Sequence, residues 1–347
     1  MKNLLLLFSV TIVVTTSINA QPYIALHSQG HINYYETFQK TLDNALDNDT
    51  IYIPGGGFDI GNATIDKTLH IYGVGWFPDS VAATAQSILE GNLYIVSGAD
   101  NGSLSGIRFS GQIFFGTDES NQTVNNYLIS RCYLHSGSHN AVLFLSYNGS
   151  IRNNSIGTII EDCLVVGIIA GGYCPSSIIR RNILHERVNN FENSLFSNNI
   201  FLWNQSWDHR TFRSVSNCIF ENNYIYDGYN PLGGVTNSTL NNNIFRYKYT
   251  FPVHGNDANE YNIVNIGLGT FVNVPNNSPN YSYDYHLKDT SPGKDAGTDG
   301  TDIGIFGTAL PFKYVPENPH ISFKDIKSKL EADGTLDVEV HVSAQDR

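Results

Sequence analysis

Between residues 178 and 245 one five-residue phrase recurs four times: Ile179-Arg-Arg-Asn182-Ile183, Phe196-Ser-Asn-Asn199-Ile200, Phe220-Glu-Asn-Asn223-Tyr224 and Leu240-Asn-Asn-Asn243-Ile244. Each copy has an apolar residue, two polar residues, an Asn and a second apolar residue. The same frame extends upstream to Ile160-Glu-Asp-Cys163-Leu164 and Ile129-Ser-Arg-Cys132-Tyr133, and more loosely to Leu104-Ser-Gly-Ile107-Arg108. Recurrence at a period of about 20 to 30 residues is the signature of a solenoid.

The phrases are short and rich in Ile, Leu, Phe and Tyr, which favour β-strands, and they contain no Pro. A single short strand cannot bury its inward side chains, so successive copies must stack at roughly 4.8 Å. Stacking would align the fourth residues in one row. We therefore expect Asn182, Asn199, Asn223 and Asn243 to form an asparagine ladder, in which Asn also tolerates left-handed backbone geometry.

The alternative architecture is an antiparallel β-sandwich or propeller made of many short strands. Two features disfavour it: the phrase is too alike from copy to copy, and hairpin dipeptides do not alternate regularly between the copies. The repeat therefore predicts an all-β parallel solenoid.

The chain resembles the right-handed parallel β-helix proteins of the pectate-lyase-like superfamily, in its secreted bacterial branch. Beside the Asn-bearing phrases, the resemblance rests on segments 49–56 and 65–75 near the start and 285–297 with Asp302-Ile-Gly304 near the end. It implies a right-handed β-helix over nearly all of the mature chain. It implies no particular reaction, because the fold hosts lyases, hydrolases and proteins without known activity.

Three regions are expected along the chain. Residues 1–20 read as a secretory signal peptide, with Lys2, an apolar stretch and a cleavage site near Ala20, so the protein is expected to be secreted, either extracellular or periplasmic. Residues 21–310 form the β-helix, with an irregular lead-in at 21–33, an amphipathic helix at 36–47 that caps the open end, and closing turns at 295–304. Residues 311–347 are a linker and a small β extension that packs back on the solenoid.

The formal net charge of −12 makes nucleic acid and anionic membranes poor partners, because both require basic patches. No segment after the signal is long and apolar enough to span a membrane. A polysaccharide or glycan is the expected partner, with the protein a monomer.

Four cysteines are present: Cys132, Cys163, Cys174 and Cys218. Cys132 and Cys163 fall at the Asn position of the repeat, where a disulfide is conceivable after export. Small buried thiols are the favoured interpretation, and no spacing matches a zinc or iron–sulfur site.

The densest candidate site is the interruption between residues 203 and 212. Its phrase Trp207-Asp-His-Arg210 is similar to one in pectate lyases, but it lacks one residue and the accompanying Arg-rich phrase, so Asp208, His209 and Arg210 are only candidate catalytic residues. Trp203 and Trp207 offer flat faces for stacking on sugar, and Arg187 is a further candidate contact. The alternative is a loop packed down by its own aromatic residues.

Two other clusters have structural interpretations. Arg180 and Arg181 should point to opposite sides of a strand and serve as solvated charge. Asp295, Asp299 and Asp302 could hold calcium, although their spacing matches no known loop and they make Asx turns equally well. No metal ligands are assigned, and calcium is the one cofactor that the lyase alternative implies.

The expected function is carbohydrate binding, or another role in polysaccharide use, without an assignable catalytic centre. One alternative is a calcium-assisted polysaccharide lyase acting on a uronate-containing polymer. The other is a structural or adhesive cell-surface protein. The Asn-Thr-Asp and Gly-Asp-Asp phrases of glycoside hydrolases of this fold are absent from the sequence.

Overall fold

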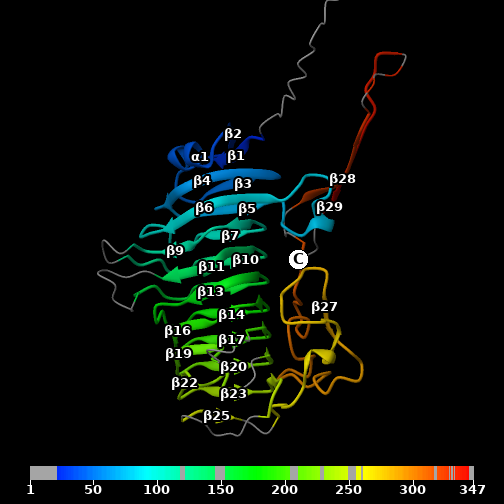
Figure 1. Ribbon diagram of the computed structural model, residues 1–347. Helices are drawn as coiled ribbons and strands as arrows, with labels where there is room; N and C mark the ends of the chain where they lie inside the picture. Colours follow the sequence, from blue (N-terminus) through cyan, green and yellow to red (C-terminus); the bar gives the residue numbers. More distant parts are fainter. Residues whose placement is uncertain are drawn as a thin grey trace, which may run out of the picture.

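The computed structural model describes residues 22–117, 122–144, 153–203, 210–226, 230–248, 255–258, 261–315, 319–327, 329, 331 and 333–343. The chain is mostly β-structure, and two large, mainly parallel sheets run the length of the molecule, an arrangement consistent with a β-solenoid (Figure 1). Strands from successive turns of the chain lie one above the next, so the two sheets form a single stack.

Sheet A has twelve strands. In spatial order they are β2 (His31–Tyr35), β1 (Ile24–Ser28), β3 (Asp49–Ile53), β5 (Leu69–Gly73), β7 (Ser103–Ser105), β10 (Leu128–Ser130), β12 (Ile159–Glu161), β14 (Ile178–Arg180), β17 (Leu195–Ser197), β20 (Ile219–Glu221), β23 (Thr239–Asn241) and β25 (Asp257–Ala258).

Sheet B contains β4 (Gly56–Ile65), β6 (Ser87–Ile95), β8 (Arg108–Ser110), β11 (Tyr133–Phe144), β13 (Leu164–Ala170), β15 (Ile183–Leu184), β18 (Ile200–Phe201), β21 (Tyr224–Ile225) and β24 (Ile244–Phe245), with β9 (Ile113–Phe115), β16 (Val188–Glu192), β19 (Phe212–Ser216) and β22 (Val235–Thr236) beside them.

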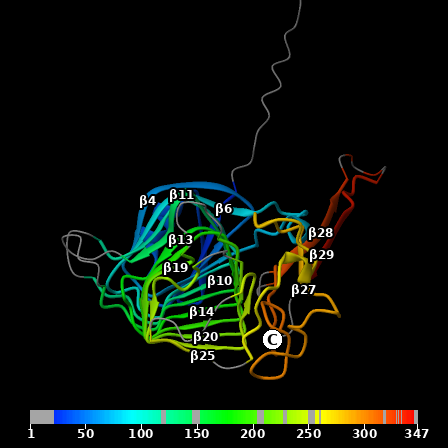
Figure 2. The same cartoon turned by 60° about the horizontal axis from the view of Figure 1, so that its bottom comes forward.

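Sheet B bends into two halves. The start of β13 pairs with β15 and its end pairs with β16, so β15 and β16 are two separate strands of the next turn. The first half comprises the strands in line with β15 and the second half those in line with β16. Together with sheet A they give the stack three faces, visible when it is tilted (Figure 2).

The predicted asparagine ladder is confirmed. The amide Nδ2 of Asn182 donates to Oδ1 of Asn199 at 3.1 Å, Asn199 donates to Asn223 at 3.0 Å and Asn223 to Asn243 at 2.9 Å. The row continues one rung further than predicted, to Asn262. Stacked phenyl rings accompany it inside the stack, where Phe196 and Phe220 lie 4.8 Å apart.

At each turn the left-handed backbone conformation occurs at the residue before the ladder residue, and not at the ladder residue itself as expected. The ladder residues are preceded by residues with positive φ: Arg131, Asp162, Arg181, Asn198, Asn222 and Asn242, with φ between 50° and 58°. This residue turns the chain from sheet A into sheet B, and its side chain therefore projects outward at the edge between the two sheets. The ladder Asn that follows it in the sequence is fully buried.

The N-terminal end carries the predicted helix and one unexpected hairpin. Helix α1 (Phe38–Asn44) buries Phe38 and Leu42, and the Thr37 side chain accepts the Lys40 N–H at its N-terminus. The expected irregular lead-in is wrong, because β1 and β2 pair antiparallel across Gln29 and Gly30, which both have positive φ. No helix of the described residues is long and apolar enough to cross a membrane.

The segment 263–315 does not close the end of the stack, as the sequence predicted for 295–304. It contains the short strands β26 (Phe271–Asn273) and β27 (Asp284–Leu287) and runs back along the side of the stack, against the outer surface of sheet B (Figures 1 and 2). Its apolar residues cover an outward row of the first half: Leu164, Ile183, Ile200, Tyr224 and Ile244.

Side chains of the left-handed residues anchor this segment. Asn198 Nδ2 donates to the carbonyls of Gly304 and Gly307, Asn222 bonds to Thr298, and Asn242 Nδ2 donates to the carbonyl of Ala296 at 2.7 Å.

The C-terminal extension is a hairpin of β28 (His320–Ile326) and β29 (Val338–Ser343). The expectation that it packs back on the solenoid is wrong: every residue of β29 is exposed, and the hairpin runs away from the stack (Figure 1).

All four cysteines are buried free thiols, as the favoured interpretation predicted. Cys163 occupies the ladder, where its backbone N–H donates to Asn182 Oδ1 at 2.9 Å.

Candidate functional site

Two of the sequence candidates, Arg187 and Trp203, lie at the corner between the two halves of sheet B. Arg187 and Trp203 lie where the chain passes this corner on successive turns, and the Arg187 guanidinium sits 5.1 Å from the centroid of the Trp203 ring. Trp203 is only 3% exposed, so its placement does not support direct stacking on a sugar. Trp207, Asp208 and His209 lie outside the described residues.

Arg210 belongs to a different surface from Arg187. It lines an open depression on the second half of sheet B, together with Arg213, Ser214 and Thr236.

A second group of polar side chains lies on the outer surface of the first half. Arg108 and Tyr133 are register neighbours on β8 and β11, and His135 is register neighbour of Ser110 and Val166. His185 follows β15 and continues the row of His135 and Val166, because its N–H donates to the Val165 carbonyl. We call the surface made by Arg108, Tyr133, His135, Val166 and His185 the open face.

The Arg108 guanidinium is held over the Tyr133 ring. The distance from its Cζ to the ring centroid is 5.4 Å, and Nη1 donates to Gln86 Oε1 at 3.0 Å. Burial raises the pKa of the Tyr133 phenol, which the nearby Arg108 charge offsets in part. The phenol is therefore protonated at neutral pH and able to donate a hydrogen bond.

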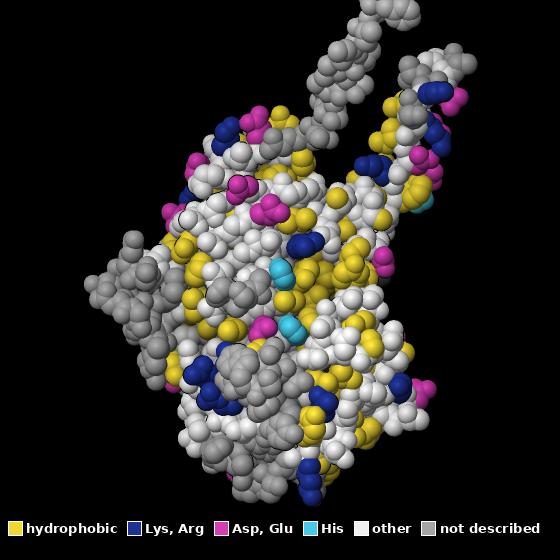
Figure 3. Space-filling view, in the orientation of Figure 1, with side chains coloured by type: hydrophobic (Ala, Val, Ile, Leu, Met, Phe, Trp, Pro, Cys, Tyr) yellow, Lys and Arg dark blue, Asp and Glu magenta, His cyan; other side chains and the backbone are white. Residues whose placement is uncertain are grey.

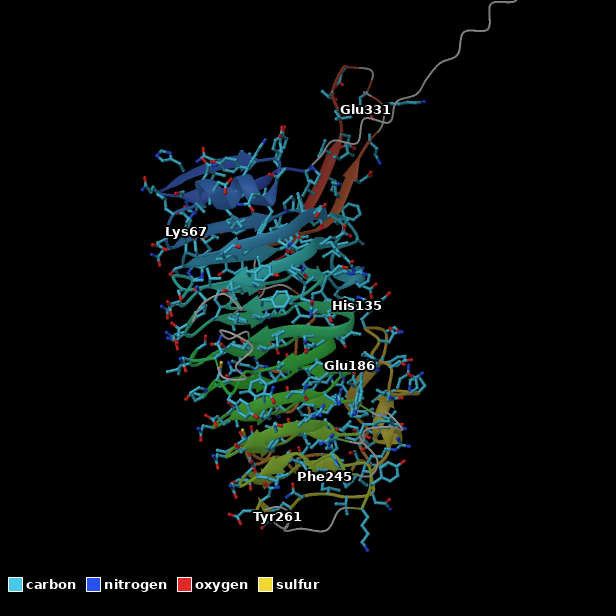
Figure 4. All side chains as sticks on the ribbon, turned by 60° about the vertical axis from the view of Figure 1, so that its left-hand side comes forward. Lys67, His135, Glu186, Phe245, Tyr261 and Glu331 are labelled. Carbon is cyan, nitrogen blue, oxygen red and sulfur yellow. The ribbon has the colours of Figure 1, made fainter. Side chains whose placement is uncertain are left out.

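Two imidazoles lie along the open face. The His135 ring is 6.0 Å from the Tyr133 ring, and two strand spacings of roughly 4.8 Å separate His135 from His185. Burial lowers the pKa of His185 and raises the pKa of the adjacent Glu186 carboxyl, whose Oε1 is 3.6 Å from Nδ1 of His185. Figure 4 places His135 and Glu186 on the same side of the stack, near the C-terminal segment.

Aromatic side chains from two distant segments wall the open face on one side. Phe77 stacks on Tyr314 at 4.6 Å and meets Tyr281 edge-on at 6.0 Å, and Trp76 lies 5.5 Å from Tyr133. In Figure 3 histidine side chains border a hydrophobic surface between the stack and the C-terminal segment. Of these rings Tyr281 is the exposed one, at 44%, and an aromatic face beside a cation and imidazoles suits a sugar ligand, which has both apolar faces and hydroxyl groups.

Three polar atoms at this face are buried without a hydrogen-bond partner among the described residues: Arg108 Nε, His185 Nδ1 and Tyr314 OH. Buried polar groups are nearly always bonded, so each of these atoms is a point where a water or a ligand can bond.

The interpretation of Arg180 and Arg181 as solvated charges pointing in opposite directions is wrong. Arg181 has φ of 53°, which turns its side chain out of the strand pattern, and both guanidiniums bind Glu161, at 2.6 Å and 2.9 Å. Arg181 also forms two bonds to Asp162, at 2.7 Å and 3.0 Å. Burial raises the pKa of Asp162, and Arg181 offsets part of this effect. Since this cluster is internally paired and mostly buried, its role is structural.

The three aspartates considered for calcium form local turns and pairs. Asp299 accepts the Thr301 N–H, and Asp302 pairs with Lys294 at 2.7 Å and accepts the Asp295 N–H. Within the described ranges, no group of three or more His, Cys, Asp or Glu side chains is arranged to hold a metal ion.

Arg108, Tyr133 and His135 were not among the candidate site residues predicted from the sequence. Their signal was present in the repeat itself. Outward positions of the first half fall one and three residues after each ladder residue. The first of these rows is apolar or aromatic apart from Arg108, and the second is mixed, with Ser110, His135, His185 and Arg246 among its members.

Neither a model of a known protein family nor a curated protein matches this chain.

Proposed function

We propose that this protein is a secreted right-handed parallel β-helix protein, similar to the pectate-lyase-like superfamily, that binds an acidic polysaccharide across the open face of sheet B. The supporting observation is Arg108, whose buried Nε has no partner within the described chain, seated beside Tyr133 between an aromatic wall and two imidazoles. A chain with a formal charge of −12 needs such a local cation to hold a polyanion.

Affinity electrophoresis tests this function. We expect polygalacturonate or alginate in the gel to retard the protein, and a neutral glucan to leave its mobility unchanged. Arg108→Gln should weaken retention by acidic polymers about tenfold, since a charge-assisted bond contributes about 1.5–3 kcal/mol. Lys40→Gln is the charge-matched control, because Lys40 is an exposed residue of helix α1.

Equal retention of the two variants, or equal retardation by the neutral glucan, would contradict the proposal. Absence of retention by any glycan would instead favour the structural or adhesive alternative.

A second candidate activity is elimination of a uronate polymer, favoured by the arrangement of Tyr133 and His135 on one strand with rings 6.0 Å apart. In this reaction His135 would take the proton at C5, C4=C5 would form as the bond from C4 to the leaving oxygen breaks, and the Tyr133 phenol would protonate that oxygen. Arg108 would neutralise the uronate carboxylate. The product's ultraviolet absorbance, measured with calcium and with a chelator, tests this activity and whether it needs the ion. If the wild-type protein and the Tyr133→Phe variant are both retained by the polymer and neither forms the unsaturated product, the protein binds the polymer without cleaving it.

A further inference from the structure

A second hollow lies around the corner from the open face, on the second half of sheet B. It has a volume of about 490 Å³ and is lined by Tyr173, Arg210, Arg213, Ser214, Ser216 and Thr236, with Val215 and Gly234. β19 and β22 form its base, in register at Ser216 and Thr236.

The backbone creates the hollow. Asn190 and Ser214 are equivalent residues of β16 and β19, and both have φ near 55°, so the two strands bend at the same point. On the next turn Gly234 lies so close that a Cβ would approach the Phe212 carbonyl oxygen to 2.6 Å. Because Gly234 has no side chain, it leaves space on the surface beside the bend in the strands.

The lining side chains are suited to an anion. Two are guanidiniums and three are hydroxyls of Ser and Thr, and none of the lining residues that the structure describes is an acid. Glu192 on β16 is the register neighbour of Ser216 on β19, and it is not one of the lining residues. Arg213 is exposed, and its register neighbour Asn189 has a buried Oδ1 without a hydrogen-bond partner among the described residues. Guanidinium forks bind planar oxyanions in two-point fashion, and the hydroxyls of the lining can bond sugar hydroxyls.

We propose that this hollow is a second binding site, separate from the open face, for a sugar that carries an oxyanion group, with Arg213 and Arg210 holding the anion. The oxyanion is either the carboxylate of a hexuronate or a sulfate group. The site assigns Arg210 a binding role, in place of the catalytic role suggested by the sequence phrase.

Isothermal titration with glucuronate, sodium sulfate and glucose at constant ionic strength tests the site. The titrations use the full-length Arg108→Gln variant, so that the result does not depend on whether the open face binds a ligand. Glucuronate should bind and glucose should not. Adding Arg213→Gln should weaken glucuronate binding at least tenfold, and adding Arg210→Gln as well should abolish it. An unchanged melting temperature confirms that the variants are folded.

Sulfate distinguishes the two sources of the anion. Competition by sulfate supports a site for the oxyanion itself, whereas glucuronate binding that sulfate does not reduce supports a carboxylate-specific site. Glucuronate affinity that is unchanged by the Arg210 and Arg213 substitutions, or glucose binding of equal strength, would overturn the proposal.

Discussion

Asn199 is bonded on both sides along the stack. Its Nδ2 donates to the Ile179 carbonyl and to Asn223, and its Oδ1 accepts both the backbone N–H and the Nδ2 of Asn182. Each ladder amide therefore ties three turns of the chain together. Because the side chain is fully buried, solvent cannot replace any of these bonds.

Replacing this amide should destabilise the fold. Asn199→Ala leaves several buried groups unbonded, so we expect the free energy of unfolding to fall by about 3 kcal/mol in urea titrations. The matched control is Asn44→Ala, which removes an exposed amide bond to the Lys40 carbonyl at 2.8 Å and should change stability by less than about 0.5 kcal/mol. Equal effects of the two substitutions would contradict a stabilising role of the buried ladder.

His185 should make stability depend on pH. Burial lowers its pKa in the folded protein, so on acidification the unfolded chain binds the proton first. Its contribution to stability is complete above the unfolded pKa of about 6.5 and is lost as the pH falls through that value toward the lower folded pKa. Melting temperatures of wild type and His185→Gln between pH 8 and pH 5 measure this as a difference in slope (roughly the range in which His titrates). Parallel curves would mean that the environment of His185 does not disfavour its charge.

At the scale of elements, the segment 263–315 supplies an outer layer that sheet B needs. Ile303 packs in the cluster that this segment forms with the outward row of the first half, and is 2% exposed. The hairpin β28–β29 makes no comparable contact, and its Ile326 is 52% exposed. The two segments should therefore differ in their contribution to stability, although both follow the repeats.

Matched Ile→Ala substitutions measure this difference. Ile303→Ala creates a buried cavity and should cost about 2–4 kcal/mol, whereas Ile326→Ala should change the free energy of unfolding by less than about 0.5 kcal/mol. A small effect of Ile303→Ala would show that the segment is only loosely held against sheet B.

The sequence was informative about the strands and much less so about their surroundings. The repeat predicted the ladder because the period, the Asn positions and the inward residues such as Phe196 and Phe220 are all local signals. It did not predict that 263–315 covers sheet B, because an apolar residue such as Ile200 has the same appearance whether it faces the interior or a covering segment.

The site was harder to predict for the same reason. Arg181 was expected on a strand, but the preceding strand ends at Arg180 and the left-handed turn directs Arg181 to Asp162. Arg108 and Tyr133 are 25 residues apart and meet only through the register of β8 and β11. Contacts across the stack depend on where each loop returns to the sheet, which the loop sequences do not specify.

At the scale of the whole molecule, we assign polysaccharide binding to the part of the outer surface of sheet B that the C-terminal segment does not cover. The C-terminal segment covers the outer surface of sheet B from Leu164 to Ile244, while Arg108, Tyr133 and His135 on the preceding turns are partly exposed, and Tyr133 packs at the edge of this cover. These three partly exposed polar residues therefore lie on the turns that precede the covered part of sheet B.

Hydrogen–deuterium exchange with and without polygalacturonate tests this account most directly. The polymer should slow exchange in peptides spanning residues 106–112, 131–136 and 183–188, and leave the β28–β29 hairpin and the outer strands of sheet A unchanged. Protection confined to sheet A or to the hairpin, with no change in those three peptides, would contradict the assignment of the open face as the binding surface.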